Sequence, residues 1–566
     1  MIEAGRVSRI EFVIDTSGVV EVLTAVLRSD RRGRRSKADG VLRLFLLGLQ
    51  LAITSERSAV IKEAYEVLTN ELTLDDQYRL GVRDPRSGRV LFSVNEFYYL
   101  TKLINHKLGY GSGVSTVSTG SDGVQVSLSD EQRGQRHDVI RDVCNRLMDA
   151  TVVGRAGVDY ALDATGIHSW SRGRAKPSPS EMRVMLEDSP DTVDVDDVGV
   201  GGVGVVDVDV VASNEVVLGA KRGIDHDAAW GIKTAKTGGK EVFFGFHEHT
   251  LVQVPALDED REEAPRLIRR FELTAASADV VDVSFRLLDS LDAPVGQLLV
   301  DNHYHYKKHD RWAKQLTRRG IRQVHDLRVD EQGFVEYERM RWAGGSAHCP
   351  GTPDALGTIL RPAPGEKTVA LHDAFHEQIN VREQYAFRRV TQADENGTQR
   401  LECPALAGKV GCALRAGSQA AAVLHGLAIV TKHPNPDGPE GLPKCCSQRT
   451  VQVTPPDTIS KLSQVLYWGS RKWDKTFRKR TYVEGSYGCR KNTSNENLRH
   501  GLFHITGLPL IHVVMAMVNV TYNLRMIDNW QARTGLLDAS HPLVIAPSNI
   551  VGFRAVSAEE EYGLSA

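Results

Sequence analysis

The stretch "VDYALDATGI" (158–167) decides the fold class that we expect. Its apolar run "YAL" followed by small, turn-forming residues is typical of a buried β-strand that ends there. A second apolar run in "VGQLLVDNHYH" (295–305) has the same form. Each run is followed directly by an aspartate, Asp163 in the first stretch and Asp301 in the second.

The chain around these two runs alternates between predicted strands and helices. We expect a hairpin over 241–257, a helix over 264–291, another over 308–320 and a short strand in "IRQVHDL" (321–327). Strand, hairpin, helix, strand and helix together predict an α/β core.

The regions on either side differ from this core. Apolar residues at helical spacing predict helices over 40–72, 93–108 and 129–152, and an all-α region with a candidate helix-turn-helix. Residues 335–455 break the rhythm with Pro, Gly, five Cys and short strand-like pieces, which indicates an insertion domain. Helical patterns return over 457–500 and 505–532.

Composition is that of a soluble globular protein, with 41% hydrophobic and 25% charged residues among 566. The apolar stretches 42–53 and 510–520 are too short and too amphipathic to span a bilayer, so we expect a cytoplasmic protein without a membrane partner. Seven cysteines, an odd number, argue for thiols or metal ligands rather than a disulfide framework.

Charge is segregated along the chain. Residues 184–220 carry nine acids and no Lys or Arg, and removing those nine from the formal net charge of −2 leaves +7. Basic residues concentrate at 27–38, 306–323 and 471–491. Such segregation permits a phosphate-binding face on a protein that is neutral as a whole. For 27–38 the choice lies between a DNA-binding arm and a solvated loop.

Asp163 and Asp301 suggest a shared site. An ionised carboxylate at the end of a buried strand is costly unless it is paired or metal-bound, and ligands sit at the carboxyl ends of strands in open α/β sheets. If the two strands are neighbours, the carboxylates converge and call for a divalent cation. The alternative for each residue is a turn or helix-cap role.

The segment "FRKRTYVEGSYGCRKN" (477–492) places one acid, Glu484, among many cations. If 475–491 is helical, one face carries five residues of interest: Phe477, Arg480, Glu484, Tyr487 and Lys491. The alternative is an exposed Arg480–Glu484 ion pair, worth about 0.3–0.5 kcal/mol.

The spacing Phe477-x2-Arg480-x3-Glu484-x6-Lys491 resembles the Tyr-x2-Arg-x3-Glu-x6-Lys signature of bacterial insertion-sequence DDE transposases. "LDATGI" looks like their first acidic strand, "LLVDNHYH" like the second, and 227–249 like the strands between them. The resemblance covers roughly 155–330 and 450–530. Phe477 departs from the usual Tyr, and the Val/Asp/Gly tract at 184–220 has no counterpart.

The resemblance implies a ribonuclease-H-like catalytic core with an all-α N-terminal region and a mixed, β-rich, Cys-containing insertion domain. The implied domains are a helical DNA-binding or dimerisation region (1–152), the first part of the core (153–334), the insertion (335–455), the second part of the core (456–540) and a tail (541–566).

The implied reaction is DNA cleavage at element ends followed by transfer of the 3′-hydroxyl strand to target DNA. Asp163, Asp301 and Glu484 would bind two Mg²⁺ ions, for which Mn²⁺ can substitute, and such ions suit phosphodiester chemistry. The implied partners are the terminal inverted repeats and target DNA, met by a homodimer near the bacterial nucleoid.

DNA contacts are expected from cations and from aromatic side chains that stack on bases. The candidates are Arg480, Lys491, Phe477, Tyr304, Trp468, Trp473, Lys233 and Lys236. For Trp473 the alternative is packing in the core.

The cysteines of the insertion form a separate candidate site. Cys403, Cys412, Cys445 and Cys446 could bind a structural Zn²⁺, with His348 and Cys349 upstream as further candidates. The alternative is that all of these thiols are reduced and unliganded.

Two rival functions use the same residues differently. A ribonuclease-H-like nuclease would cut DNA without joining it, whereas a domesticated, non-catalytic protein would bind a specific DNA sequence without turnover.

Overall fold

The computed structural model describes most of the chain in two compact units. The described residues are 2–28, 38–55, 57, 60–111, 128–154, 157–171, 225–234, 240–254, 263–305, 307–362, 368–434, 441–492, 498, 505–537 and 540–544. Unit 1 comprises Met1–Gly157, Leu162–Asp292 and Thr481–Ala566, and unit 2 comprises Val158–Ala161 and Ala293–Arg480.

The fold is α/β with a mixed sheet, which confirms the general class predicted from the sequence. The strands of this sheet are β1 (Asp159–His168), β2 (Ala229–Thr234), β3 (Lys240–Val254), β4 (Ile268–Ala275), β5 (Gln297–Leu299) and β6 (Arg322–Val324). Their order is β2-β3-β1-β5-β6, with β4 also paired to β3. The β1–β5 and β5–β6 pairs are parallel, whereas the β2–β3 and β3–β4 pairs are antiparallel.

Three predictions of secondary structure need correction. β1 does not end at Asp163 but continues to His168. The expected hairpin at 241–257 is a single strand, β3, which pairs with β2 and β4 and contains an irregularity between Leu251 and Val252. The expected helix at 264–291 begins as strand β4 and becomes helical only in α9 (Val280–Asp289). Pairing with β3 along almost all of β4 overrides its local helical pattern.

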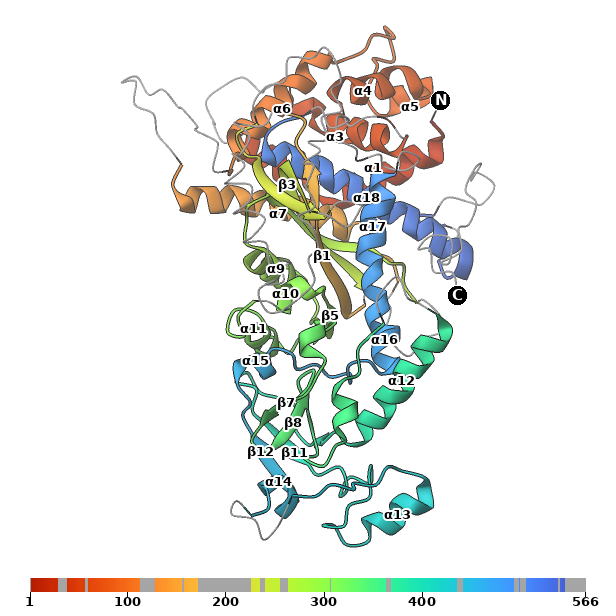
Figure 1. Cartoon of the computed structure of the whole chain (residues 1–566). Coiled ribbons are helices and arrows are strands. Elements are labelled where there is room, and N and C mark those ends of the chain that lie inside the picture. The colour runs from red at the N-terminus through yellow and green to blue at the C-terminus, as the bar shows by residue number, and fades with distance from the viewer. Residues whose placement is uncertain are drawn as a thin grey trace, which may run out of the picture. The chain divides into compact units, whose positions relative to one another are not determined.

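Unit 1 contains the helices predicted over 40–72, 93–108, 129–152 and 505–532. Its helices besides α9 are α1 (Ala4–Ser17), α2 (Val19–Leu27), α3 (Ala38–Thr54), α4 (Ile61–Glu66), a π-helical turn (Val67–Glu71), α5 (Leu74–Arg79), α6 (Val94–Leu108), α7 (Asp130–Asp149), α17 (Thr481–Lys491) and α18 (Leu508–Thr534). Helix α18 packs against α3, α6, α7 and β4 (Figure 1). The N-terminal helices therefore share one unit with the sheet strands β2, β3 and β4.

Helix α18 is longer than the apolar stretch 510–520 suggested. Among the described residues it alone is long and apolar enough to cross a membrane, but 89% of its apolar window is buried inside the protein. This burial is compatible with a core helix of a soluble protein.

The strands within 335–455 are short, as expected, but this range also contains a 16-residue helix, α12 (Val369–Gln384), that was not expected. The helices of unit 2 are α10 (Asn302–His305), α11 (Ala313–Arg318), α12, α13 (Ser418–His425), α14 (Lys444–Ser447), α15 (Asp457–Ser460) and α16 (Arg471–Phe477). Two small antiparallel sheets consist of β7 (Val335–Tyr337), β8 (Met340–Ala343) and β9 (Ser346–His348), and of β10 (Arg388–Arg389), β11 (Gln399–Glu402) and β12 (Thr450–Val453). The predicted insertion is thus part of a larger unit that begins before it and extends to Arg480.

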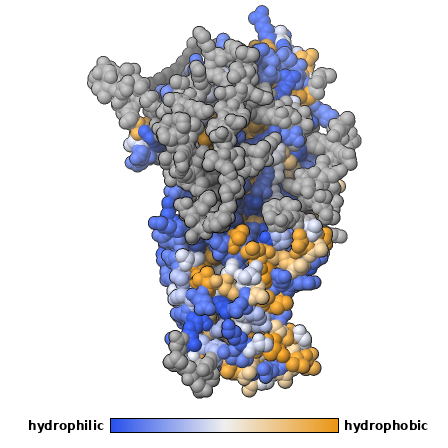
Figure 2. Space-filling model, viewed as in Figure 1, coloured by the Kyte–Doolittle hydropathy of each residue, from blue (hydrophilic) through white to orange (hydrophobic). Residues whose placement is uncertain are grey.

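The surface of unit 2 is mixed in hydropathy. Figure 2 shows hydrophobic residues beside hydrophilic ones on the face that is drawn. Two of the exposed apolar residues, Val423 and Leu424, belong to helix α13.

Candidate functional site

In unit 1, side chains of helix α17 donate hydrogen bonds to strand β1; both elements are labelled in Figure 1. The Tyr487 hydroxyl donates a hydrogen bond of 2.7 Å to the backbone oxygen of Asp163. Lys491 Nζ donates to the Thr165 hydroxyl at 2.6 Å and to the Gly166 backbone oxygen at 3.3 Å. These bonds hold α17, the helix that contains Glu484 and Lys491, against β1, the strand that contains Asp163.

Two of the three predicted catalytic acids therefore lie on elements that touch. Asp163 is half-buried, and its Oδ1 accepts a 2.7 Å hydrogen bond from the Ala164 N–H. Glu484 is exposed in the first turn of α17. It precedes Tyr487 by three residues, which places both on one side of the helix.

A buried polar cluster lies beneath α17, and the sequence analysis missed it. Arg490 Nη1 donates to Glu248 Oε1 at 2.6 Å and also bonds the side-chain oxygen of Asn519. Asn519 Nδ2 donates to the same Glu248 oxygen at 3.0 Å, and all three residues are 0% exposed. Burial alone would lower the pKa of Arg490, but the Glu248 carboxylate outweighs it and the pKa is raised.

Arg490 is therefore a structural cation of the core. The sequence contains one signal for this ion pair. Glu248 lies within the apolar run of 241–257, and a fully buried acid requires a partner.

Tyr487 is held in its neutral, hydrogen-donating form. Burial raises its pKa well above the usual value, and the nearby carboxylates of Asp163 and Glu248 raise it further. The bond to the Asp163 carbonyl is consequently present across the physiological pH range.

In unit 2, Asp301 comes two residues after the end of strand β5. Its side chain accepts a hydrogen bond from the His303 N–H and so caps the short helix α10, which is the alternative role considered from the sequence. Within this unit, residues Tyr160 and Ala161 of β1 pair in parallel with Leu298 and Leu299 of β5. The two acidic strands are thus neighbours, the condition under which the sequence predicted convergent carboxylates.

The segment predicted as one helix over 475–491 is interrupted. Helix α16 ends at Phe477, a 3₁₀ turn covers Arg478–Arg480, and α17 begins at Thr481. Phe477 stacks on Trp473, with ring centroids 5.0 Å apart and an interplanar angle of 8°. The Arg480 guanidinium lies 5.6 Å from the centre of the Phe477 ring. At position 477 the aromatic ring serves packing in unit 2.

Three residues predicted to contact DNA are buried instead. Trp473 is 0% exposed, and Trp468 and Tyr304 are each 2% exposed. The Trp473 indole donates to the His325 backbone oxygen at 3.2 Å and to Gln464 at 3.1 Å. The prediction that these three rings stack on DNA bases is therefore wrong. For Trp473 the alternative considered from the sequence, packing in the core, is confirmed.

Other predicted features lie wholly or partly outside the described residues. These are Lys236, most of the basic run at 27–38 and the acidic tract at 184–220. Only the backbone of Lys233 is described, and it pairs with Glu241 of β3.

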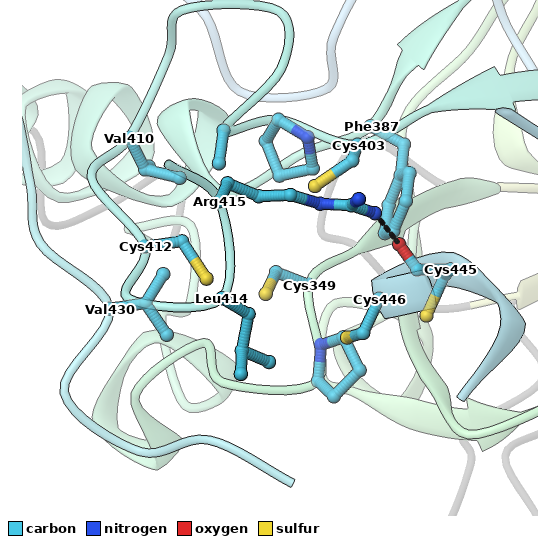
Figure 3. Close-up of a pocket in the computed structure, with 13 residues that line it drawn as sticks. Cys349, Phe387, Cys403, Val410, Cys412, Leu414, Arg415, Val430, Cys445 and Cys446 are labelled. Atoms are coloured by element: carbon cyan, nitrogen blue, oxygen red, sulfur yellow. Dashed lines mark hydrogen bonds between the residues drawn. The ribbon is translucent and has the colours of Figure 1, made fainter. Parts of the chain in front are cut away.

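The cysteines of unit 2 gather around one small pocket (Figure 3). It is lined by Cys349, Cys403, Cys412, Cys445 and Cys446. His348 is not part of this group, because its ring bonds the Tyr467 hydroxyl at 2.7 Å and the Arg341 backbone oxygen at 3.2 Å. As the side chains stand, no group of three or more His, Cys, Asp or Glu residues in the described part of the chain is arranged to hold a metal ion.

Comparisons of the chain with protein-family profiles, with curated proteins and with solved structures give no match.

Proposed function

We propose that this chain is a DDE transposase that cleaves DNA at the ends of an insertion element and joins the freed 3′-hydroxyl strand to target DNA. The observation that carries the proposal is the bond between Tyr487 and the Asp163 backbone oxygen. It ties the helix bearing Glu484 to the strand bearing the first acid of the resemblance.

The proposal requires a third carboxylate, and Asp301 is the candidate. It comes two residues after Leu299, just as Asp163 comes two residues after Ala161, the partner of Leu299 in the parallel register. Side chains at equivalent positions of paired parallel strands point to the same face of the sheet. A ribonuclease-H-like core is the fold that we propose on this basis.

The chemistry of these side chains fits Mg²⁺. Three carboxylates supply hard oxygen ligands and leave positions for water and a substrate phosphate. Two bound ions would activate the attacking oxygen and neutralise charge on the leaving oxygen of the phosphodiester.

The remaining residues would hold and orient the DNA and the acids. Arg480 would contact backbone phosphate as a planar fork. Lys491 donates two hydrogen bonds to β1, and its positive charge would attract a backbone phosphate. Tyr487 and Arg490 would keep α17 in place without touching DNA.

Metal binding provides the first test. Calorimetric titration of the full chain with Mn²⁺ should give a binding isotherm that Asp163→Asn and Glu484→Gln each abolish. Glu131→Gln is the matched control, because Glu131 is also an exposed glutamate in the first turn of a helix. Unchanged Mn²⁺ binding in Glu484→Gln would contradict the proposed site.

The nuclease alternative uses the same acids, so metal binding does not separate it. A supercoiled target plasmid supplied with pre-cut, labelled element ends distinguishes the two. A transposase covalently joins the label to the plasmid, whereas a nuclease without strand transfer leaves the label in short fragments only.

A further inference from the structure

We propose that unit 2 binds one structural Zn²⁺ through the thiolates of Cys349, Cys403, Cys412 and Cys446, a site independent of the proposed catalytic acids. This set differs from the four cysteines expected from the sequence, because Cys349 replaces Cys445. The argument rests on where the thiols lie, on what surrounds them and on what this part of the fold lacks.

The convergence of the thiols is the first observation. Five of the seven cysteines of the chain line one pocket, although they come from separate places in unit 2. Cys349 follows β9, Cys403 follows β11, Cys412 lies in the loop before α13, and Cys445 and Cys446 lie in α14. Figure 3 shows the sulfur atoms of Cys349, Cys403, Cys412 and Cys446 around the pocket, with Cys445 at its edge.

The pocket suits a single ion. The space between its lining atoms, open solvent included, is about 300 Å³. The part that a water-sized particle can enter holds only about one such particle. The sulfurs are not yet arranged around a common centre. Rotation about the Cα–Cβ bond moves a cysteine sulfur between staggered positions, and the proposal requires such rotations to bring the four sulfurs to one centre.

A metal ion bound by these cysteines would stabilise the region around the two small sheets. The strands of the two small sheets are two to four residues long. Short elements bury little apolar area, and small, loop-rich regions are usually stabilised by disulfides or a metal. The cysteines are free thiols, and four of them belong to the hydrophobic cluster that joins both sheets.

A buried thiol without a metal behaves as a small apolar side chain that offers only weak hydrogen bonding. A Zn²⁺ ion would change this chemistry, because a coordinating thiol is deprotonated outright.

Charged and polar neighbours are placed to support thiolates. Arg415 lies along the pocket and donates to the backbone oxygens of Cys445 at 3.4 Å and Gln448 at 2.6 Å. The charges of Arg415 and Arg339 act on Cys446, and Cys445 donates a hydrogen bond to it. His433 Nδ1 lies 3.7 Å from the Cys412 sulfur and can donate to its thiolate.

The positions of the sulfur atoms decide between the adjacent cysteines. The sulfur of Cys446 lies around the pocket with the other three and that of Cys445 lies at its edge, so Cys446 is the fourth ligand (Figure 3). Binding then exchanges four S–H protons for four Zn–S bonds. The resulting −2 charge of the tetrathiolate centre is offset by Arg415 and Arg339.

Elemental analysis of the purified full chain tests the site. We expect about one zinc per chain in the wild type and in Cys445→Ser, and a loss of at least about tenfold in each ligand variant, Cys349→Ser, Cys403→Ser, Cys412→Ser and Cys446→Ser. Cys144→Ser is the matched control, because Cys144 is also buried but lies in α7 of unit 1. Wild-type protein without zinc after reconstitution under reducing conditions would overturn the proposal.

A spectroscopic measurement covers variants that fail to fold. Co²⁺ exchanged into the wild-type chain should give the visible bands of tetrahedral cobalt with thiolate-to-metal charge transfer. Octahedral cobalt bands, or cysteines that prove to be oxidised to disulfides in the folded protein, would contradict it. Zinc retained in Cys446→Ser but lost in Cys445→Ser would overturn the assignment of the fourth ligand.

Discussion

The hydroxyl of Tyr487 donates a 2.7 Å hydrogen bond to the backbone oxygen of Asp163, more than 300 residues away in the sequence. This bond joins α17 to the middle of β1 at the one residue of that strand predicted to be catalytic. This contact, the bonds of Lys491 to β1 and the buried Arg490–Glu248 pair together hold the helix that bears Glu484 in unit 1.

Removing the Tyr487 hydroxyl should weaken the attachment of α17 to β1 without leaving a cavity in the core. In Tyr487→Phe the Asp163 carbonyl loses its donor, which should lower the free energy of unfolding by about 1–2 kcal/mol. Chemical denaturation measures this loss, and Mn²⁺ affinity should weaken in parallel. Tyr482→Phe is the matched control, since Tyr482 is a neighbouring tyrosine on α17 with a half-exposed ring. Equal effects in both variants would show that the Tyr487 bond has no special part.

The Glu248–Arg490 pair should behave as a unit. Glu248→Leu or Arg490→Met alone strands a buried charge and should cost about 3–5 kcal/mol of stability. The double variant Glu248→Leu/Arg490→Met should cost much less than the sum of the single losses. A double-mutant cycle from denaturant midpoints measures the coupling. Strict additivity would mean that the ion pair is not formed in the folded protein.

Acid sensitivity in unit 1 should depend on His512. Burial in α18 lowers its pKa to about 3, and its Nδ1 shares a 2.9 Å hydrogen bond with the Tyr110 hydroxyl. The folded-state pKa lies below the unfolded value of about 6.5. The stabilisation is therefore complete above pH 6.5 and is lost as the pH falls from there towards 3.

The size of this effect can be measured directly. Between pH 7 and pH 5, His512 alone should account for a loss of about 2 kcal/mol in the free energy of unfolding. His512→Gln should flatten the pH dependence by that amount, as followed by urea denaturation at each pH. Parallel curves for wild type and variant would show that His512 is protonated in the folded state at pH 5.

The elements that could be predicted from the sequence are those whose pattern is local. Helices α3, α6 and α7 follow from apolar spacing, and the strand before Asp301 follows from its apolar run. The general α/β class follows from the alternation of such elements. Strand β4 was mistaken for a helix, because its pairing with β3 is a tertiary interaction that local spacing does not record.

For the candidate sites, too, local patterns could be predicted from the sequence, whereas contacts between distant residues could not. The spacing from Phe477 to Lys491 can be read from the chain alone, whereas the partner of Arg490 lies 242 residues away in β3. The aromatic–basic pattern around Trp473 could not distinguish a DNA surface from a core, since stacking rings and packed rings look alike in sequence. The pocket formed by five cysteines required the fold to bring their segments together.

Cleavage of labelled duplex DNA from the ends of the encoding element tests the central claim most directly. With Mg²⁺ present, wild type and Glu131→Gln should cut at the element ends. Glu484→Gln should be at least about 1000-fold slower, equivalent to about 4 kcal/mol in the activation free energy. Denaturation midpoints of the three proteins should agree, because Glu484 is exposed. Cleavage by Glu484→Gln at the wild-type rate would contradict the proposed active site.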